Sequence, residues 1–307
     1  MDYCQAIEQE IQGRKHGFLA GNITYYIGGF HGSWNLGEHE TIGLTHPFHH
    51  DLRSRGVGLV ESGITGTEHT GVGNDYNGWE FYKDTRVLYG TVIVDGQRYK
   101  HPKPTSMKWR PDKTICEYEV AGVMIREEKF IAPNDAIASI ITSSERIELE
   151  FSGNSFWHRK SVTSTAEIEY DRHNNAIVIT EGGTVESRPD PDAPGREGPC
   201  VYQGMSTVLS ASVNFDRSIK THTDDKGVQH YTFTVPCDSQ GTTVVWAMHD
   251  DRQTALKDAS LLLKYTDSAL VSKTKEMNRL LNDEVPYFRC SDQKFVDIYY
   301  YLWSLYL

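Results

Sequence analysis

The segment richest in chemically useful side chains lies near the N-terminus and combines glycine, histidine and one tryptophan. It runs from Gly28 to Glu40 and continues to Asp51. Glycines let a backbone pass close to a ligand, and an indole ring offers a stacking plane. Because long loops often carry function, we take this segment as a substrate-facing loop. The candidate substrate-binding residues are His31, Trp34, His39 and Glu40. A loop packed against a neighbouring domain would have a similar composition, and packing is the commoner origin of such a segment.

The same segment raises the question of a metal site, because five histidines fall within twenty residues. They are His31, His39, His46, His49 and His50. Zinc ligands usually follow a helical His-x3-His spacing or another defined spacing. Here Pro47 interrupts the spacer between His46 and His49, and neighbouring histidines are no recognised ligand pattern. We therefore predict no metal site and no cofactor.

Two further clusters place charged groups beside aromatic rings. Residues from Glu61 to Asp84 hold several carboxylates among tyrosine, tryptophan and phenylalanine, which would suit a glycosidase cleft. Their spacing does not specify a catalytic pair, and a turn-rich loop explains the same composition. The run from Phe156 to Lys160 is typical of an exposed strand end as well as of a sugar or phosphate contact. With no phosphate-binding loop and no nucleophile elbow, we assign no catalytic residue to this chain.

Composition limits the possible partners and the compartment. The chain has 307 residues and a formal net charge of −11, which argues against nucleic acid and anionic membranes as partners. No apolar run approaches the ~20 residues of a membrane span. The N-terminus lacks a basic region followed by an apolar stretch, so no secretory signal is expected. Five cysteines without close pairing suit reduced thiols, and we predict a cytoplasmic protein.

The elements that must position these residues are mostly strands. From Ile23 to about Met248 the sequence shows short apolar-polar alternations separated by turn signals such as Asp95-Gly96 and Ala121-Gly122. About a dozen strands without a helical repeat predict a mainly β fold, a large antiparallel β-supersandwich. We expect residues 28–57 and 62–78 to be irregular. The predicted strands are 23–27, 58–61, 79–82, 86–94, 115–120, 123–131, 136–142, 147–151, 166–170, 176–180, 206–213, 230–235 and 243–248.

The pattern changes from strands to helices after Met248. A short helix is also expected within residues 1–20. Helical spacing predicts linker helices over about 252–265 and 268–281, followed by an extended segment up to Cys290. A last helix should start at Ser291 as N-cap. Its apolar and aromatic residues nearly encircle the helix, so we expect it to be buried on several sides by a further domain.

The joint between the two parts resembles a known arrangement. The segment Val285-Pro286-Tyr287-Phe288 is followed by an aromatic helix that contains Tyr299-Tyr300-Tyr301-Leu302-Trp303. Arg252 to Leu307 thus looks like the crossing between the N-terminal β-supersandwich and the (α/α)6 toroid of six-hairpin glycosidases. Within these enzymes it is most similar to the glycoside hydrolase family 63 group, which is α-glucosidase-like. The resemblance implies that 1–249 form the supersandwich, 250–290 the helical linker and 291–307 the first helix of the toroid.

The resemblance also implies a function. These enzymes hydrolyse glycosidic bonds with inversion, using a carboxylic acid and a carboxylate that activates water. Their catalytic acids lie later in the toroid, so this chain would brace the toroid and lend loops to the sugar site. The expected partners are a carbohydrate substrate and a C-terminal helical toroid domain, with no nucleic acid and no membrane. A disaccharide phosphorylase of similar architecture and a non-catalytic carbohydrate-binding β-sandwich remain as alternatives.

Overall fold

The computed structural model describes most of the chain beyond residue 85 and several short strands before it. The described residues are 1–10, 16–20, 31–35, 41–45, 59–63, 86–100, 102–134, 136–154, 162–185, 200–225, 227–249 and 251–306. The predicted strands 23–27 and 79–82 lie outside these residues. So do the run from Phe156 to Lys160 and, beyond Gly63, the cluster from Glu61 to Asp84.

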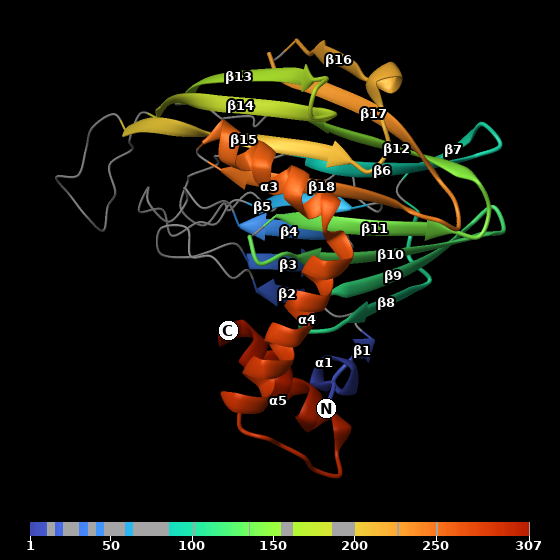
Figure 1. The fold of residues 1–307 in the computed structure, drawn as a ribbon, viewed down its shortest axis with the longest axis vertical. Coiled ribbons are helices and arrows are strands. Elements are labelled where there is room, and N and C mark those ends of the chain that lie inside the picture. The colour runs from blue at the N-terminus through green and yellow to red at the C-terminus, as the bar shows by residue number, and fades with distance from the viewer. Residues whose placement is uncertain are drawn as a thin grey trace.

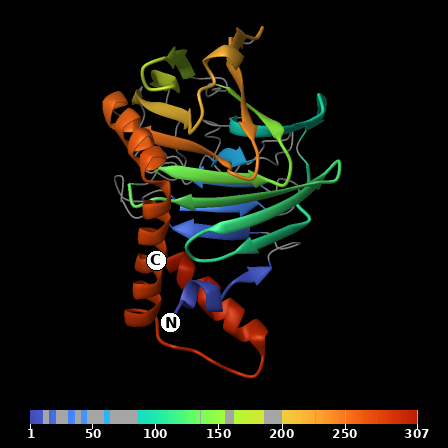
Figure 2. The same ribbon diagram turned by 45° about the vertical axis from the view of Figure 1, so that its right-hand side comes forward.

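Two sheets, called sheet A and sheet B below, pack face to face (Figures 1 and 2). In the described part each sheet has nine strands, and every pairing is antiparallel except β5 with β6. Sheet A has the order β1 (Gln9–Glu10), β8 (Ser106–Trp109), β9 (Thr114–Val120), β10 (Val123–Ile131), β11 (Ile137–Ser143), β18 (Thr242–His249), β15 (Cys200–Ala211), β14 (Ala176–Val185), β13 (Val162–Asp171). Sheet B has the order β16 (Lys220–Thr223), β17 (Gln229–Cys237), β12 (Ile147–Asn154), β6 (Arg86–Val94), β5 (Leu59–Gly63), β4 (Thr41–Thr45), β3 (His31–Asn35), β2 (His16–Ala20), with β7 (Gln97–Lys100) also paired to β6. The predicted mainly β, antiparallel fold is confirmed.

Side-chain alternation explains why these strands form. In β12, Ile147, Leu149 and Phe151 are buried, whereas the residues between them are exposed or partly exposed. The predicted hairpin turns are confirmed as well. Both residues of Asp95-Gly96 and of Ala121-Gly122 have positive φ, between 50° and 81°, as a two-residue type I′ turn requires.

Two hydrophobic clusters stabilise the sandwich. The larger one fills the space between the sheets and includes inward-facing residues of β9, β10, β11, β12, β17 and β18. The second lies on the outer face of sheet A, where helix α3 (Arg252–Lys264) covers β15 and β18. Figure 1 shows α3 running across these strands. The domain is therefore layered as helix, sheet A, sheet B.

The helices lie close to their predicted positions. Helix α3 is capped by Asp251, which accepts a hydrogen bond from the Thr254 amide. Helix α4 (Thr266–Asp283) follows directly, and α5 (Gln293–Tyr306) comes after the extended segment. The N-cap of the last helix is a correction. Asp292, not Ser291, accepts the Lys294 amide at 3.0 Å, because a carboxylate is the stronger acceptor at a positive helix end.

Other predictions about local structure were wrong. Residues 28–57 are not wholly irregular, since β3 and β4 lie within them, and β5 enters the second segment expected to be irregular. The short helix predicted within residues 1–20 is confirmed as α1, a single turn over Tyr3–Ala6, but strand β2 at 16–20 was not predicted. Short strands with internal glycine, as in β4, have a weak alternation signal because glycine has low β-propensity. The four-residue strands β7, β8 and β16 were not predicted, because four residues are too few for a clear alternation pattern.

Two further features bear on the predicted compartment. Cys4, Cys116, Cys237 and Cys290 are free thiols; these are the cysteines whose side chains the structure describes. Across the described ranges, no helix combines the length and the apolar character that crossing a bilayer requires.

The layer of α3 on sheet A gives a first prediction. Leu262 is buried in the outer cluster, whereas its neighbour Leu261 is 42% exposed. Leu262→Ala should lower the free energy of unfolding by about 2–5 kcal/mol, because it leaves a cavity. The matched control Leu261→Ala should change it by less than about 0.5 kcal/mol. Urea unfolding measures both, and equal losses would contradict this packing.

Candidate functional site

The residues proposed to contact substrate lie in the N-terminal strands or beside them. His31 and Trp34 belong to β3, which pairs with β2 and β4 in sheet B. His39 and Glu40 fall between β3 and β4, outside the described residues. Their roles therefore stay predictions.

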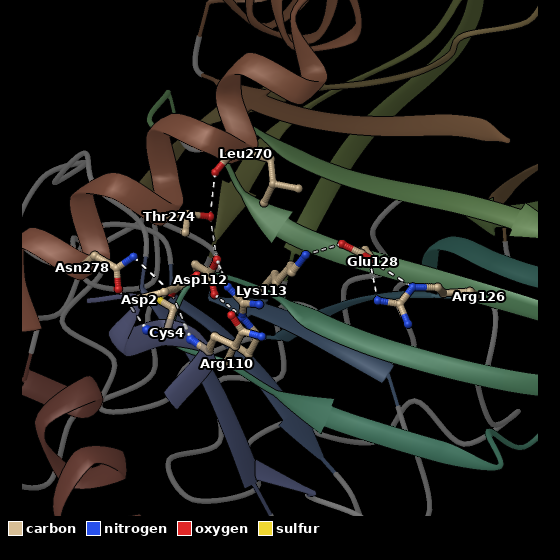
Figure 3. Close-up of polar contacts among 11 residues, drawn as sticks. Asp2, Cys4, Arg110, Asp112, Lys113, Arg126, Glu128, Leu270, Thr274 and Asn278 are labelled. Atoms are coloured by element: carbon tan, nitrogen blue, oxygen red, sulfur yellow. Dashed lines mark hydrogen bonds and ion pairs between the residues drawn. The ribbon is translucent and has the colours of Figure 1, made fainter. Parts of the chain in front are cut away.

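The structure brings a different set of residues together, at the joint between sheet A and the helices. Figure 3 shows this joint, where α4 passes the turn between β8 and β9 and the N-terminal segment. The contributing residues are Asp2, Cys4, Arg110, Asp112, Thr274 and Asn278. They come from three regions that are far apart in the sequence.

Asp112 is the centre of the joint and is fully buried. Arg110 binds it through two nitrogens, with Nε 2.9 Å from Oδ1 and Nη2 3.0 Å from Oδ2. From α4, the hydroxyl of Thr274 lies 2.6 Å from Oδ2 and also approaches the carbonyl oxygen of Leu270 at 3.0 Å. Burial opposes the charge on Arg110, but the hydrogen bonds and charge of Asp112 outweigh it and raise the pKa of Arg110. Thr274 thus fastens α4 to this ion pair.

The N-terminal segment fastens the same face of α4 one turn further along, at Asn278. The amide of Cys4 donates to Asn278 Oδ1 at 2.9 Å, and Asn278 Nδ2 donates to Asp2 Oδ1 at 3.2 Å. The hydroxyl of Tyr3 donates to Asn282 Oδ1 at 3.1 Å. Burial, reinforced by the charge of Asp112, raises the pKa of the Cys4 thiol. Cys4 is thus a packing residue and not a nucleophile.

Further along, the N-terminal segment is anchored to the edge of sheet A. Strand β1 pairs with β8, with Gln9 opposite Trp109. Glu10 accepts hydrogen bonds from the Met107 amide at 3.1 Å and from the Ser106 hydroxyl at 3.3 Å. Residues 2–10 therefore connect the sheet edge to α4 as a strap.

A third hydrophobic cluster lies below this joint and holds α5. Its buried members are Cys4, Ile7, Met277, Leu281, Val285 and Tyr300. The extended segment before α5 is tied to the helix, because Tyr299 donates to the Pro286 carbonyl at 2.6 Å and Tyr300 accepts the Phe288 amide at 3.2 Å. Figure 2 shows α1, α4 and α5 gathered at one end of the molecule. The orientation of α5 is thus set by contacts from both ends of the chain.

The opposite face of α5 is not covered by the described residues. Phe295, Ile298 and Leu302 are 62%, 53% and 47% exposed, whereas Tyr300 is only 3% exposed. Their spacing of three and four residues places them on one side of the helix. Tyr287, before the helix, is 68% exposed. We call Phe295, Ile298 and Leu302 the α5 stripe.

The joint and the α5 stripe offer an anchored helix with an exposed apolar face. Within the part of the chain that the structure describes, no group of three or more His, Cys, Asp or Glu residues could hold a metal ion. Asp112 is fully buried and pairs with Arg110, whose side chain is 12% exposed. The candidate site therefore consists of the joint at Asp112 and the α5 stripe, an apolar face on an anchored helix.

Sequence reasoning found part of this site. The exposed aromatic helix was recognised from its periodicity. Asp112 and Thr274 were missed, since they are 162 positions apart and each is unremarkable in its own context. The only local signal was the Arg110-Pro111-Asp112-Lys113 turn between two strands.

Comparison with known proteins gives distant similarities only. No protein-family model and no curated protein matches this chain. Among solved structures, a protein assigned as a kojibiose phosphorylase from the human microbiome is 13% identical with a TM-score of 0.40, over 73% of this chain and 32% of that one. A bacterial glucoamylase complexed with acarbose is 9% identical with a TM-score of 0.36, over 68% of this chain and 34% of that one. The chain spans about a third of the length of each. Neither match points to the glycoside hydrolase family 63 group, which stays a prediction.

The buried carboxylate gives a second prediction. Asp112→Asn should lower the free energy of unfolding by about 3–5 kcal/mol, because it removes the carboxylate that pairs with the largely buried Arg110 side chain. Glu117→Gln is the matched control, since Glu117 pairs with Arg126 at the surface, with side chains 41% and 44% exposed. That change should cost less than about 1 kcal/mol. Urea unfolding measures both variants, and a loss under 1 kcal/mol for Asp112→Asn would show that the joint is not needed.

Proposed function

We propose that this chain is the N-terminal part of an inverting glycoside hydrolase that acts on α-glucosides or related oligosaccharides. The observation that carries the proposal is the α5 stripe, three large apolar side chains held on one face of a firmly anchored helix. Burying each such side chain is worth about 1.5–3 kcal/mol, so a covering domain would be bound strongly. We identify that domain as a C-terminal helical toroid, of which α5 is the first helix.

In this proposal the parts of the chain have separate roles. Residues 1–249 form the sandwich, 250–290 the linker, and 291–307 begin the toroid. The catalytic acid and base belong to the toroid, where one protonates the leaving oxygen and the other activates water from the opposite face. The sandwich braces the toroid through the joint at Asp112, and His31, Trp34, His39 and Glu40 contact the carbohydrate. The protein needs no cofactor or metal and works in the cytoplasm, without nucleic-acid or membrane partners.

The docking role is tested on the chain by itself. An uncovered apolar stripe promotes self-association, so the 307-residue chain should associate as its concentration rises. The variant Phe295→Gln/Ile298→Gln/Leu302→Gln should reduce this association at least severalfold in sedimentation velocity. Met124→Gln is the control, because Met124 is 48% exposed but lies on β10, away from α5. A chain that stays monomeric at all concentrations would contradict the docking role.

The enzymatic role is tested on the chain extended by a C-terminal helical domain. We expect release of reducing sugar from α-linked disaccharides without added phosphate. A strict requirement for phosphate would identify a phosphorylase instead. If the extended protein is inert while the 307-residue chain binds sugar in calorimetry, the chain is a carbohydrate-binding module and the proposal is wrong.

A further inference from the structure

The inward-facing side of sheet A carries a group of polar residues where the two sheets meet. In β10, Glu127 and Lys129 lie between Ile125 and Ile131, every second residue of the strand. The two isoleucines pack in the cluster between the sheets. Because alternate residues of a strand share a face, both charges point into the sandwich. They are 0% and 3% exposed.

Neighbouring strands supply hydrogen bonds to this pair. The Tyr118 hydroxyl, from β9, donates to Glu127 Oε2 at 2.8 Å. The Ser139 hydroxyl, from β11, donates to Oε1 at 2.5 Å, and Lys129 Nζ lies 3.3 Å from the same oxygen. Removing two charges from water is costly, so a pair at this depth needs all the polar contacts it can make.

Two more polar groups lie on the same face, one beside the pair and one a strand further away, and their hydroxyls have no hydrogen-bond partner. Thr114 on β9 lies directly opposite Lys129 in the strand register. Thr242 on β18 lies opposite Ile141, which is itself opposite Glu127. The two threonines are 0% and 2% exposed, and neither Oγ1 atom has a partner. A buried hydroxyl without a partner costs about 1–3 kcal/mol.

These six residues run across four adjacent strands, and we call them the polar stripe. They are Thr114, Tyr118, Glu127, Lys129, Ser139 and Thr242. Strand β2 of sheet B lies against β10, so the stripe is enclosed between the sheets. The core of an ordinary sandwich would hold apolar side chains at these positions. The unpartnered hydroxyls of Thr114 and Thr242 in these polar surroundings point to a ligand that forms hydrogen bonds.

We propose that the polar stripe is a binding site for ordered water inside the sandwich, with Thr114 and Thr242 as its outer ligands. Water both donates and accepts, so it can satisfy a threonine hydroxyl and a charged group at once. Buried waters typically make two to four such bonds. The stripe carries one positive and one negative charge, which suits a neutral ligand. A polyol has the same hydroxyl chemistry, but residues exposed by 6% or less leave it no open path.

The sign of a stability change tests this site. Thr→Val keeps the side-chain shape and removes the hydroxyl. If water binds there, Thr114→Val and Thr242→Val lose its hydrogen bonds, and each should lower the thermal midpoint by about 2–4 °C. If the hydroxyls have no ligand, removing them relieves a desolvation cost and the midpoint should rise.

Thr207→Val is the matched control for these variants. Thr207 is 1% exposed, faces the same interior from β15, and its hydroxyl also lacks a partner. Its register neighbours are Ile179 and Met248, neither of which is charged. The control should leave the midpoint unchanged or raise it. A rise in all three variants would overturn the proposal.

A crystal structure provides the direct observation. We expect water density within hydrogen-bonding distance of Thr114 Oγ1 and Thr242 Oγ1. Crystals soaked in glycerol should show the same waters. A dry stripe, or glycerol in place of the waters, would overturn the assignment. Because both tests probe the sandwich interior, their outcome is independent of the enzymatic role proposed above.

Discussion

The carboxylate of Asp112 lies at zero exposure, so its charge must be met by the groups around it. Arg110 supplies the counter-charge from the same turn, and Thr274 supplies a hydroxyl from α4. A buried ion pair costs much desolvation and tolerates little displacement. The position of α4 on the sheet is consequently fixed at one point along its length. The positions of the neighbouring helices depend on their contacts with α4.

Helix α4 transmits this constraint because it contacts two hydrophobic clusters. Its first half packs through Ala269 and Leu270 against the cluster between α3 and the outer face of sheet A. Its second half contributes Met277 and Leu281 to the cluster that holds α5. The N-terminal strap closes the arrangement by joining the edge of sheet A to α4. The α5 stripe is thereby presented in a defined direction by a rigid support, as a docking surface requires.

Two features depart from the usual rule that apolar groups lie inside and polar groups outside. The α5 stripe exposes large apolar side chains, and the polar stripe buries an ion pair with two unpartnered threonines. Each departure costs free energy in the isolated chain. In the two proposals above, a covering protein surface offsets the first cost and bound water offsets the second. Both stripes are therefore candidate binding features.

The sequence by itself determined the class of fold and most of its elements. Alternation in β6, β10 and β12, paired turn residues and helical spacing after Met248 are local signals, so they could be read without a structure. The strands before residue 86 were mostly not predicted, because short strands that contain glycine show only weak apolar-polar alternation. The aromatic helix was likewise recognised, though its cap was misplaced by one residue. Only the tertiary structure decided which face of α5 is covered, that Asp112 meets Thr274, and that Glu127 and Lys129 lie inside. These facts depend on residues far apart in the chain, and a buried aspartate or lysine has the same local pattern as an exposed one.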